Sequence, residues 1–87
     1  MDDRFEVLVT GESMWPVLIP GKRYIARRDQ EPAVGDIVVA INPNDAANTI
    51  VKRLTVINGD KYQLVGTVSW SSTFAVTRQQ ILGVLTL

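Results

Sequence analysis

The 87-residue sequence contains no histidine and no cysteine, and these two absences exclude much of familiar enzyme chemistry. Without histidine there is no Ser-His-Asp triad, no imidazole metal ligand and no side chain that ordinarily titrates near neutral pH. Without cysteine there is no thiol nucleophile, disulfide, thiolate zinc site or iron–sulfur cluster. An enzyme made from this chain must therefore use serine, threonine, lysine, tyrosine or carboxylate side chains.

The sequence also lacks an excess of charge, a long apolar run and a cluster of acidic residues. Nine Lys and Arg balance nine Asp and Glu, so no net field attracts nucleic acid or an anionic membrane. No apolar run approaches the ~20 residues of a membrane span, and the acidic start Met1-Asp2-Asp3 is unlike a signal peptide. We therefore expect a soluble cytoplasmic protein with no membrane anchor, nucleic-acid partner, cofactor or metal.

What is present is the composition of one small globular domain, with 46% hydrophobic and 21% charged residues. We assign residues 1–87 to a single domain, because a chain of this length supports only one core. Six or seven short β-like runs are separated by turn signals, and no run has a helical pattern of three turns. The expected strands span residues 5–10, 24–28, 36–42, 49–57, 61–65, 75–77 and 81–87. This pattern predicts an all-β fold, either a coiled antiparallel sheet or a partly open barrel.

The C-terminal third is nearly uncharged. From Tyr62 onward the only charged side chain is Arg78, although this stretch is rich in large apolar residues. One interpretation is a core strand with its flanks. The other is a surface for self-association, which would make the protein a homodimer, or for peptide binding.

Ser13 and Lys52 are the residues best suited to chemistry in a chain without histidine. A serine hydroxyl needs a base to become a nucleophile, and a lysine amine serves if its pKa falls from about 10.4 to about 7–8. Burial lowers the pKa of a lysine. Alternation places Lys52 on one strand face with Ile50, Leu54 and Val56, but it permits either a buried or a snorkelling lysine. The Gly-x-Ser at Ser13 likewise fits an ordinary turn or a hydroxyl presented beside backbone N–H groups.

Four motifs occur in order over roughly residues 7–57. They are Gly-x-Ser-Met-x-Pro at residues 11–16, Val-Leu-Ile-Pro-Gly at 17–21, Val-Gly-Asp-Ile-Val-Val at 34–39 and Val-Lys-Arg at 51–53. This series resembles the LexA/signal-peptidase superfamily of Ser-Lys peptidases. Within that superfamily, the lack of a membrane anchor and the compact length make this chain most similar to the small soluble nickel-type superoxide dismutase maturation proteases. The resemblance implies the coiled, barrel-like β domain of LexA C-terminal domains and signal peptidases.

The resemblance also implies roles for individual residues. Ser13 matches the nucleophile, with its backbone N–H as an oxyanion donor, and Lys52 matches the general base. Met14 matches the residue that lines the pocket for the side chain before the cut. We assign Trp15 to the rim of the substrate site, with a core-capping role as the alternative. Gly11 stands where bacterial signal peptidases carry an additional hydroxyl, as it does in the LexA branch.

The C-terminal third departs from the family pattern. Signal-peptidase-like members have Gly-Asp-Asn and then Ser-x-Asp-Ser-Arg, whereas this chain reads Gly-Thr-Val at residues 66–68 and has no Asp after Asp60. In one register Ser72 matches the serine that orients the lysine, while Phe74 and Val76 replace the acid–base pair. Another register deletes several residues and aligns 81–83 with the closing strand.

We therefore expect a serine endopeptidase with a Ser-Lys dyad that cleaves a peptide or protein substrate after small residues. The main alternative is a module that keeps the fold, lacks turnover and acts in binding or dimerisation. A self-cleaving regulatory domain, as in the LexA branch, is the third hypothesis and requires a cleavage segment upstream of the first strand.

Overall fold

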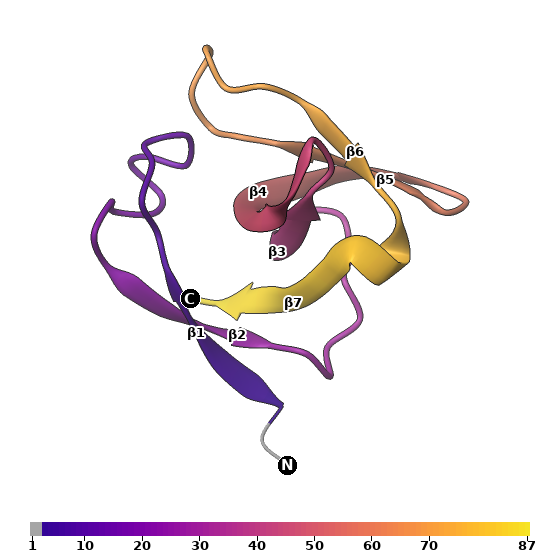
Figure 1. Ribbon diagram of the computed structural model, residues 1–87, viewed down its shortest axis with the longest axis horizontal. Coiled ribbons are helices and arrows are strands. Elements are labelled where there is room, and N and C mark those ends of the chain that lie inside the picture. Colours follow the sequence, from indigo (N-terminus) through magenta and orange to yellow (C-terminus); the bar gives the residue numbers. More distant parts are fainter. Residues whose placement is uncertain (1–2) are drawn as a thin grey trace.

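The computed structural model describes residues 3–87, and these form one open sheet of seven antiparallel strands (Figure 1). The strands are β1 (Arg4–Leu8), β2 (Arg23–Arg27), β3 (Ile37–Asn42), β4 (Asp45–Asn58), β5 (Lys61–Val65), β6 (Phe74–Val76) and β7 (Ile81–Thr86), and a short 3-10 turn, η1 (Arg78–Gln80), precedes β7. Their order in the sheet is β1-β2-β7-β3-β4-β5-β6. The predicted all-β, coiled and partly open architecture is confirmed. The acidic start at Met1 and Asp2 lies outside the described residues.

The sheet coils so that side chains on both of its faces are buried. Strand β3 lies between β7 and β4, and its alternate residues enter different cores. Ile37 and Val39 belong to one cluster, together with residues of β1 and of the turn that follows it. Val38 and Ala40 belong to a second cluster with residues of β4 to β7. Because both faces are covered, β3 is a continuous apolar run rather than an alternating one.

Strand β4 is the longest and has different partners along its length. It pairs with β3 from Asp45 to Arg53 and with β5 from Arg53 to Asn58. A two-residue turn, Gly59 and Asp60, joins β4 to β5 between the paired residues Asn58 and Lys61, and Gly59 has φ +61°. The pairing with β5 shifts register after Leu54. That irregularity explains why Val56, expected on the apolar face, is 46% exposed.

The C-terminal strand β7 occupies the middle of the sheet and joins β2 to β3. Ile81, Val84 and Leu85 are buried, so the core interpretation of the apolar C-terminal stretch holds for this strand. Trp70 and Leu87 are instead exposed at 72% and 76%. Within residues 3–87 there is no helix long and apolar enough to cross a membrane.

Candidate functional site

Ser13 lies in the turn that follows β1, here called the Ser13 turn (residues 11–18). Met14 and Leu18 are buried in the first core cluster and fasten this turn to the sheet. The turn also closes on itself, because the N–H of Leu18 donates to the carbonyl of Met14 at 2.9 Å and that of Trp15 to the carbonyl of Glu12 at 3.0 Å. The buried side chains of Met14 and Leu18, both after Ser13 in the chain, therefore fix the backbone that carries the half-buried Ser13.

Lys52 lies near the middle of β4 and is buried, with only 7% of its surface exposed. Ile50 and Leu54 share its face of the strand, as alternation predicts. The choice that the sequence left open is thus resolved in favour of burial. Burial disfavours the ammonium form and lowers the pKa of Lys52 below its ordinary value.

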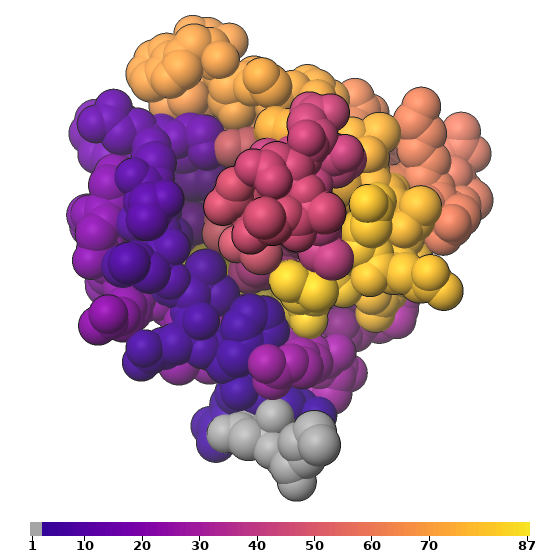
Figure 2. Space-filling view, viewed as in Figure 1, coloured from indigo at the N-terminus to yellow at the C-terminus, as the bar shows by residue number. Residues whose placement is uncertain are grey.

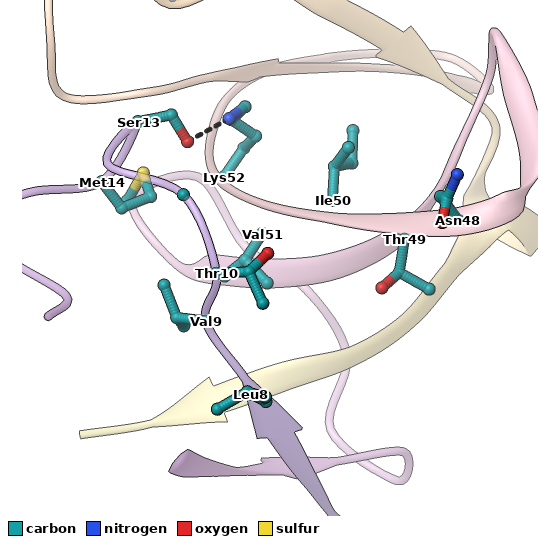
Figure 3. A pocket seen from close by; sticks show the side chains of 11 residues that line it. Leu8, Val9, Thr10, Ser13, Met14, Asn48, Thr49, Ile50, Val51 and Lys52 are labelled. Atoms are coloured by element: carbon teal, nitrogen blue, oxygen red, sulfur yellow. Dashed lines mark hydrogen bonds between the residues drawn. The ribbon is translucent and has the colours of Figure 1, made fainter. Parts of the chain in front are cut away.

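The two side chains meet although they are 39 residues apart in the chain. Nζ of Lys52 donates a hydrogen bond to Oγ of Ser13 (Figure 3). The ring of Phe74 lies 5.9 Å from the same nitrogen, measured to the ring centroid. Across residues 3–87 no carboxylate forms an ion pair with Lys52, and no three His, Cys, Asp or Glu side chains gather as metal ligands. The polar partner of the Lys52 amine is thus the hydroxyl of Ser13, and the nearby ring of Phe74 carries no charge.

A cavity of about 310 Å³ opens beside the Ser13–Lys52 pair. Its walls come from the end of β1 with the Ser13 turn, and from the first half of β4 (Figure 3). The lining residues are Leu8, Val9, Thr10, Gly11, Ser13, Met14, Asn48, Thr49, Ile50, Val51 and Lys52. Met14 lies in the cavity wall, and its role in the pocket for the side chain before the cut stays a prediction. Trp15 does not line the cavity and is 55% exposed, and its place at the rim of the substrate site stays a prediction.

The two walls of this cavity are strand edges with open backbone groups. In β4, residues 45–52 pair only with β3, because pairing with β5 starts at Arg53. The opposite wall pairs only with the β2 side, where Val9 exchanges hydrogen bonds with Lys22 and Gly21. Antiparallel alternation then directs the N–H and C=O groups of Thr49 and Val51 into the gap from one side. The same rule directs those of Leu8 and Thr10 into it from the other.

The connection between β5 and β6 (residues 66–73, the β5–β6 connection) also reaches the Ser13 turn. The backbone N–H of Thr67 donates to the carbonyl of Ser13 at 2.7 Å. In the space-filling view this orange connection lies along the edge of the molecule beside the indigo and purple residues that follow β1 (Figure 2). The sequence offered one signal for this contact, namely Gly66 and Thr67 at the position of the family Gly-Asp-Asn motif.

Ser72 belongs to the same connection but is exposed. Its carbonyl accepts a hydrogen bond from Oγ of Ser71 at 3.4 Å. No hydrogen bond joins Ser72 to Lys52 in the described part of the chain. The role of Ser72 in orienting the lysine therefore stays a prediction, and Phe74 is the residue of this region that lies close to the amine.

In this coiled β domain, a serine on a turn meets a buried lysine beside a cavity. The family model described as signal peptidase, peptidase S26, matches residues 5–69, and the chain belongs to this family. The match includes Ser13, Lys52 and Thr67 and ends before Ser72 and Phe74. No curated protein matches the chain. The nickel-type superoxide dismutase maturation subtype stays a prediction.

Proposed function

We propose that the protein is a serine endopeptidase in which Ser13 is the nucleophile and Lys52 the general base. The observation that carries this proposal is the hydrogen bond between Lys52 Nζ and Ser13 Oγ, made by a lysine that is 7% exposed. Burial shifts the amine toward its neutral form, and only a neutral amine can take the hydroxyl proton. Burial of a lysine without a carboxylate partner costs free energy, because its charged form loses contact with water. Stability therefore does not explain the burial of Lys52, whereas a role as a base does.

The expected reaction has two halves. Neutral Lys52 takes the proton of the Ser13 hydroxyl as Oγ attacks the peptide carbonyl carbon, and the carbonyl oxygen becomes an oxyanion. The ammonium of Lys52 then gives its proton to the leaving nitrogen, the C–N bond breaks, and an acyl ester remains on Ser13. In the second half, water gives a proton to Lys52 and attacks the ester, and the proton returns to Ser13 Oγ as the acid leaves.

Backbone N–H groups of the Ser13 turn are the proposed oxyanion donors. Within residues 3–87 the N–H groups of Ser13 and Met14 have no hydrogen-bond partner, and both residues line the cavity. Free donors beside the nucleophile are what an oxyanion requires. Gly11 supplies no side-chain hydroxyl, so we assign the stabilisation to the backbone.

The proposed substrate is an extended peptide that enters the cavity as an additional strand. The open edges at residues 8–10 and 49–51 support this geometry, because each offers backbone donors and acceptors toward the gap. The apolar floor at Met14 and Ile50 fits uncharged side chains. The family resemblance favours small residues immediately before the cut.

The proposal is tested with internally quenched fluorescent peptides that carry Ala, Gly or Ser before the bond to be cut. Ser13→Ala should abolish cleavage of these peptides. The far-UV circular dichroism and the unfolding midpoint should remain those of the wild type. Ser69→Ala is the matched control, since Ser69 is exposed and has no hydrogen bond in the described structure. Cleavage that survives in purified Ser13→Ala protein would disprove the mechanism. Peptide binding without any cleavage by the wild type would favour the alternative of a binding module.

A further inference from the structure

The carbonyl groups of the Ser13 turn are all engaged, from Glu12 to Trp15. The carbonyls of Glu12 and Met14 accept N–H donors from within the turn. The other two accept bonds from the β5–β6 connection, mainly from Thr67: its N–H donates to the Ser13 carbonyl at 2.7 Å, and its Oγ1 donates to the Trp15 carbonyl at 2.7 Å. The N–H of Val68 adds a longer bond to the Ser13 carbonyl, at 3.4 Å. Thr67 therefore binds the turn through the carbonyl groups on both sides of Met14. It lies in the β5–β6 connection, 54 residues after Ser13 in the chain.

The hydroxyl of Thr67 has one proton and two carbonyl neighbours. Its distance to the Ser13 carbonyl is 3.3 Å, longer than the 2.7 Å to the Trp15 carbonyl. Since one proton makes one strong bond, the hydroxyl chiefly holds Trp15, while the backbone N–H holds Ser13. The two bonds act on different peptide groups, so removing the side-chain oxygen releases one of them and leaves the other.

Gly66 allows this close approach. A Cβ built at Gly66 would lie 2.5 Å from the Ser13 carbonyl oxygen. It would also lie 2.6 Å from the Cβ of Ser71. Real Cβ atoms do not come so near a backbone oxygen, so any side chain at Gly66 would push the connection away from the turn. Gly66 and Thr67 thus act together: the glycine leaves room for the connection to approach the Ser13 turn, and the threonine makes the hydrogen bonds to it.

We propose that Thr67 is a positioning residue that fixes the Ser13 turn so that Oγ of Ser13 meets Nζ of Lys52. This inference rests on the proposed function. A peptide carbonyl and the N–H of the next residue point in opposite directions across the peptide plane. Holding the Ser13 carbonyl on Thr67 therefore directs the N–H of Met14 away from the connection. Thr67 itself does not line the cavity, so it acts on the reacting groups and not on the bound substrate.

Thr67→Val and Thr67→Ser test this inference. Valine keeps the shape and the backbone N–H but loses the hydroxyl, and we expect kcat to fall about tenfold, corresponding to ~1.4 kcal/mol in the barrier, with KM unchanged. Serine keeps the hydroxyl and should restore kcat to within about twofold. A fall in kcat that serine does not restore, or a rise in KM alone, would overturn the positioning role.

Thr55→Val is the matched control. Thr55 Oγ1 also donates to a backbone carbonyl, that of Gln63 at 3.2 Å, but it does so between β4 and β5. Both valine variants should therefore lose similar unfolding stability, and only Thr67→Val should lose kcat. Equal losses of kcat in both would show that Thr67 acts merely through general stability.

A second measurement separates this inference from the proposed function. The titration of Lys52 is followed by the NMR shift of its ε-carbon in the wild type, Ser13→Ala, Thr67→Val and Thr55→Val. Thr67→Val should move the pKa of Lys52 in the same direction as Ser13→Ala, and Thr55→Val should leave it unmoved. If the wild type shows no Ser13-dependent turnover, the proposed function fails, and this titration still decides whether Thr67 positions Ser13. An unmoved pKa in Thr67→Val would refute the positioning role whether or not the wild type cleaves peptides.

Discussion

The ring of Phe74 lies 5.9 Å from Nζ of Lys52, and in one of the two registers predicted from the sequence Phe74 stands where the signal-peptidase pattern has an acidic residue. The distance is at the outer limit for attraction between a cation and a ring face. Exclusion of water is therefore the larger effect of Phe74, and it acts in the same direction as the burial that lowers the pKa of Lys52. A carboxylate near the amine would have had the opposite effect. The departure from the family pattern thus favours a neutral lysine.

Phe74→Ala should shift the pH dependence of activity. Activity should rise with pH as Lys52 loses its proton, because the neutral amine is the base. Removing the ring admits water, raises the pKa of Lys52 toward its ordinary value and moves the rising limb of kcat/KM to higher pH. Phe74→Leu keeps an apolar cover and should retain the wild-type profile more closely. The measurement is kcat/KM between pH 6 and about 10.5, near the ordinary pKa of lysine; an unmoved limb in Phe74→Ala would contradict this account.

Lys52→Met should lower turnover roughly a thousandfold or more, the scale seen when a member of a catalytic unit is removed. It should also change how stability depends on pH. The folded-state pKa of Lys52 lies below the unfolded-state value of about 10.4, so between these values the unfolded chain binds more protons. The free energy of unfolding of the wild type should therefore rise with pH through that window.

Lys52→Met should remove that rise and be relatively most stabilising at the lower pH. Urea unfolding at several pH values measures it, with Lys61→Met as the control because Lys61 is exposed on β5. A wild type whose stability difference from Lys52→Met does not change with pH would show that Lys52 has an ordinary pKa.

Gly66→Ala should destabilise the protein by about 1–3 kcal/mol, the usual cost of forcing an extra carbon into a packed site. The reason is the 2.5 Å approach of a Cβ to the Ser13 carbonyl. Gly11→Ala is the control for stability, since a Cβ at Gly11 meets nothing within 4 Å. Chemical denaturation compares the two variants. A Gly66→Ala protein as stable as the wild type would mean that the β5–β6 connection does not pack against the Ser13 turn.

An uncleaved peptide bound to Ser13→Ala protein should protect the amides of Thr49 and Val51 from hydrogen exchange. These N–H groups face the gap between the two open strand edges and gain partners when a strand is added. The amides of Ile50 and Lys52 serve as internal controls, because they face the paired strand β3. Binding without added protection at Thr49 and Val51 would rule out the added strand.

The strands were predictable because their local signals agree with the fold. The range predicted for β5, residues 61–65, matches Lys61–Val65, since the turn at Gly59 and Asp60 sets its start and alternation fixes its face. Strand β4 begins earlier than its predicted start at residue 49, because the hairpin with β3 already closes at the pair Asn42 and Asp45. The start of β4 is therefore set by its pairing with β3, and the turn residues in the sequence did not show how far this pairing extends.

The candidate site was less predictable, because it depends on contacts between distant strands. Alternation placed Lys52 beside Ile50 but did not decide its burial, which the Ser13 turn and Phe74 complete from elsewhere in the chain. The only sequence signal at Thr67 was its place in the family Gly-Asp-Asn position, and that signal did not name Ser13 as its partner, because the contact forms where two loops meet. The residue types and the resemblance both supplied Ser13 and Lys52 as candidates, but one register aligned Phe74 only as a replacement for a lost acid and did not place its ring near the lysine.

The position of β7 has a consequence for synthesis of the protein. Among the strands of residues 3–87 it follows all the others in the chain, yet it pairs with both β2 and β3 and so joins, within the sheet, the part that leads to Ser13 to the part that carries Lys52. A nascent chain in which residues 81–86 are still inside the ribosome lacks that link. We expect Ser13 and Lys52 to meet stably only after residues 81–86 have left the ribosome, so that the proposed dyad stays unformed while the earlier strands emerge.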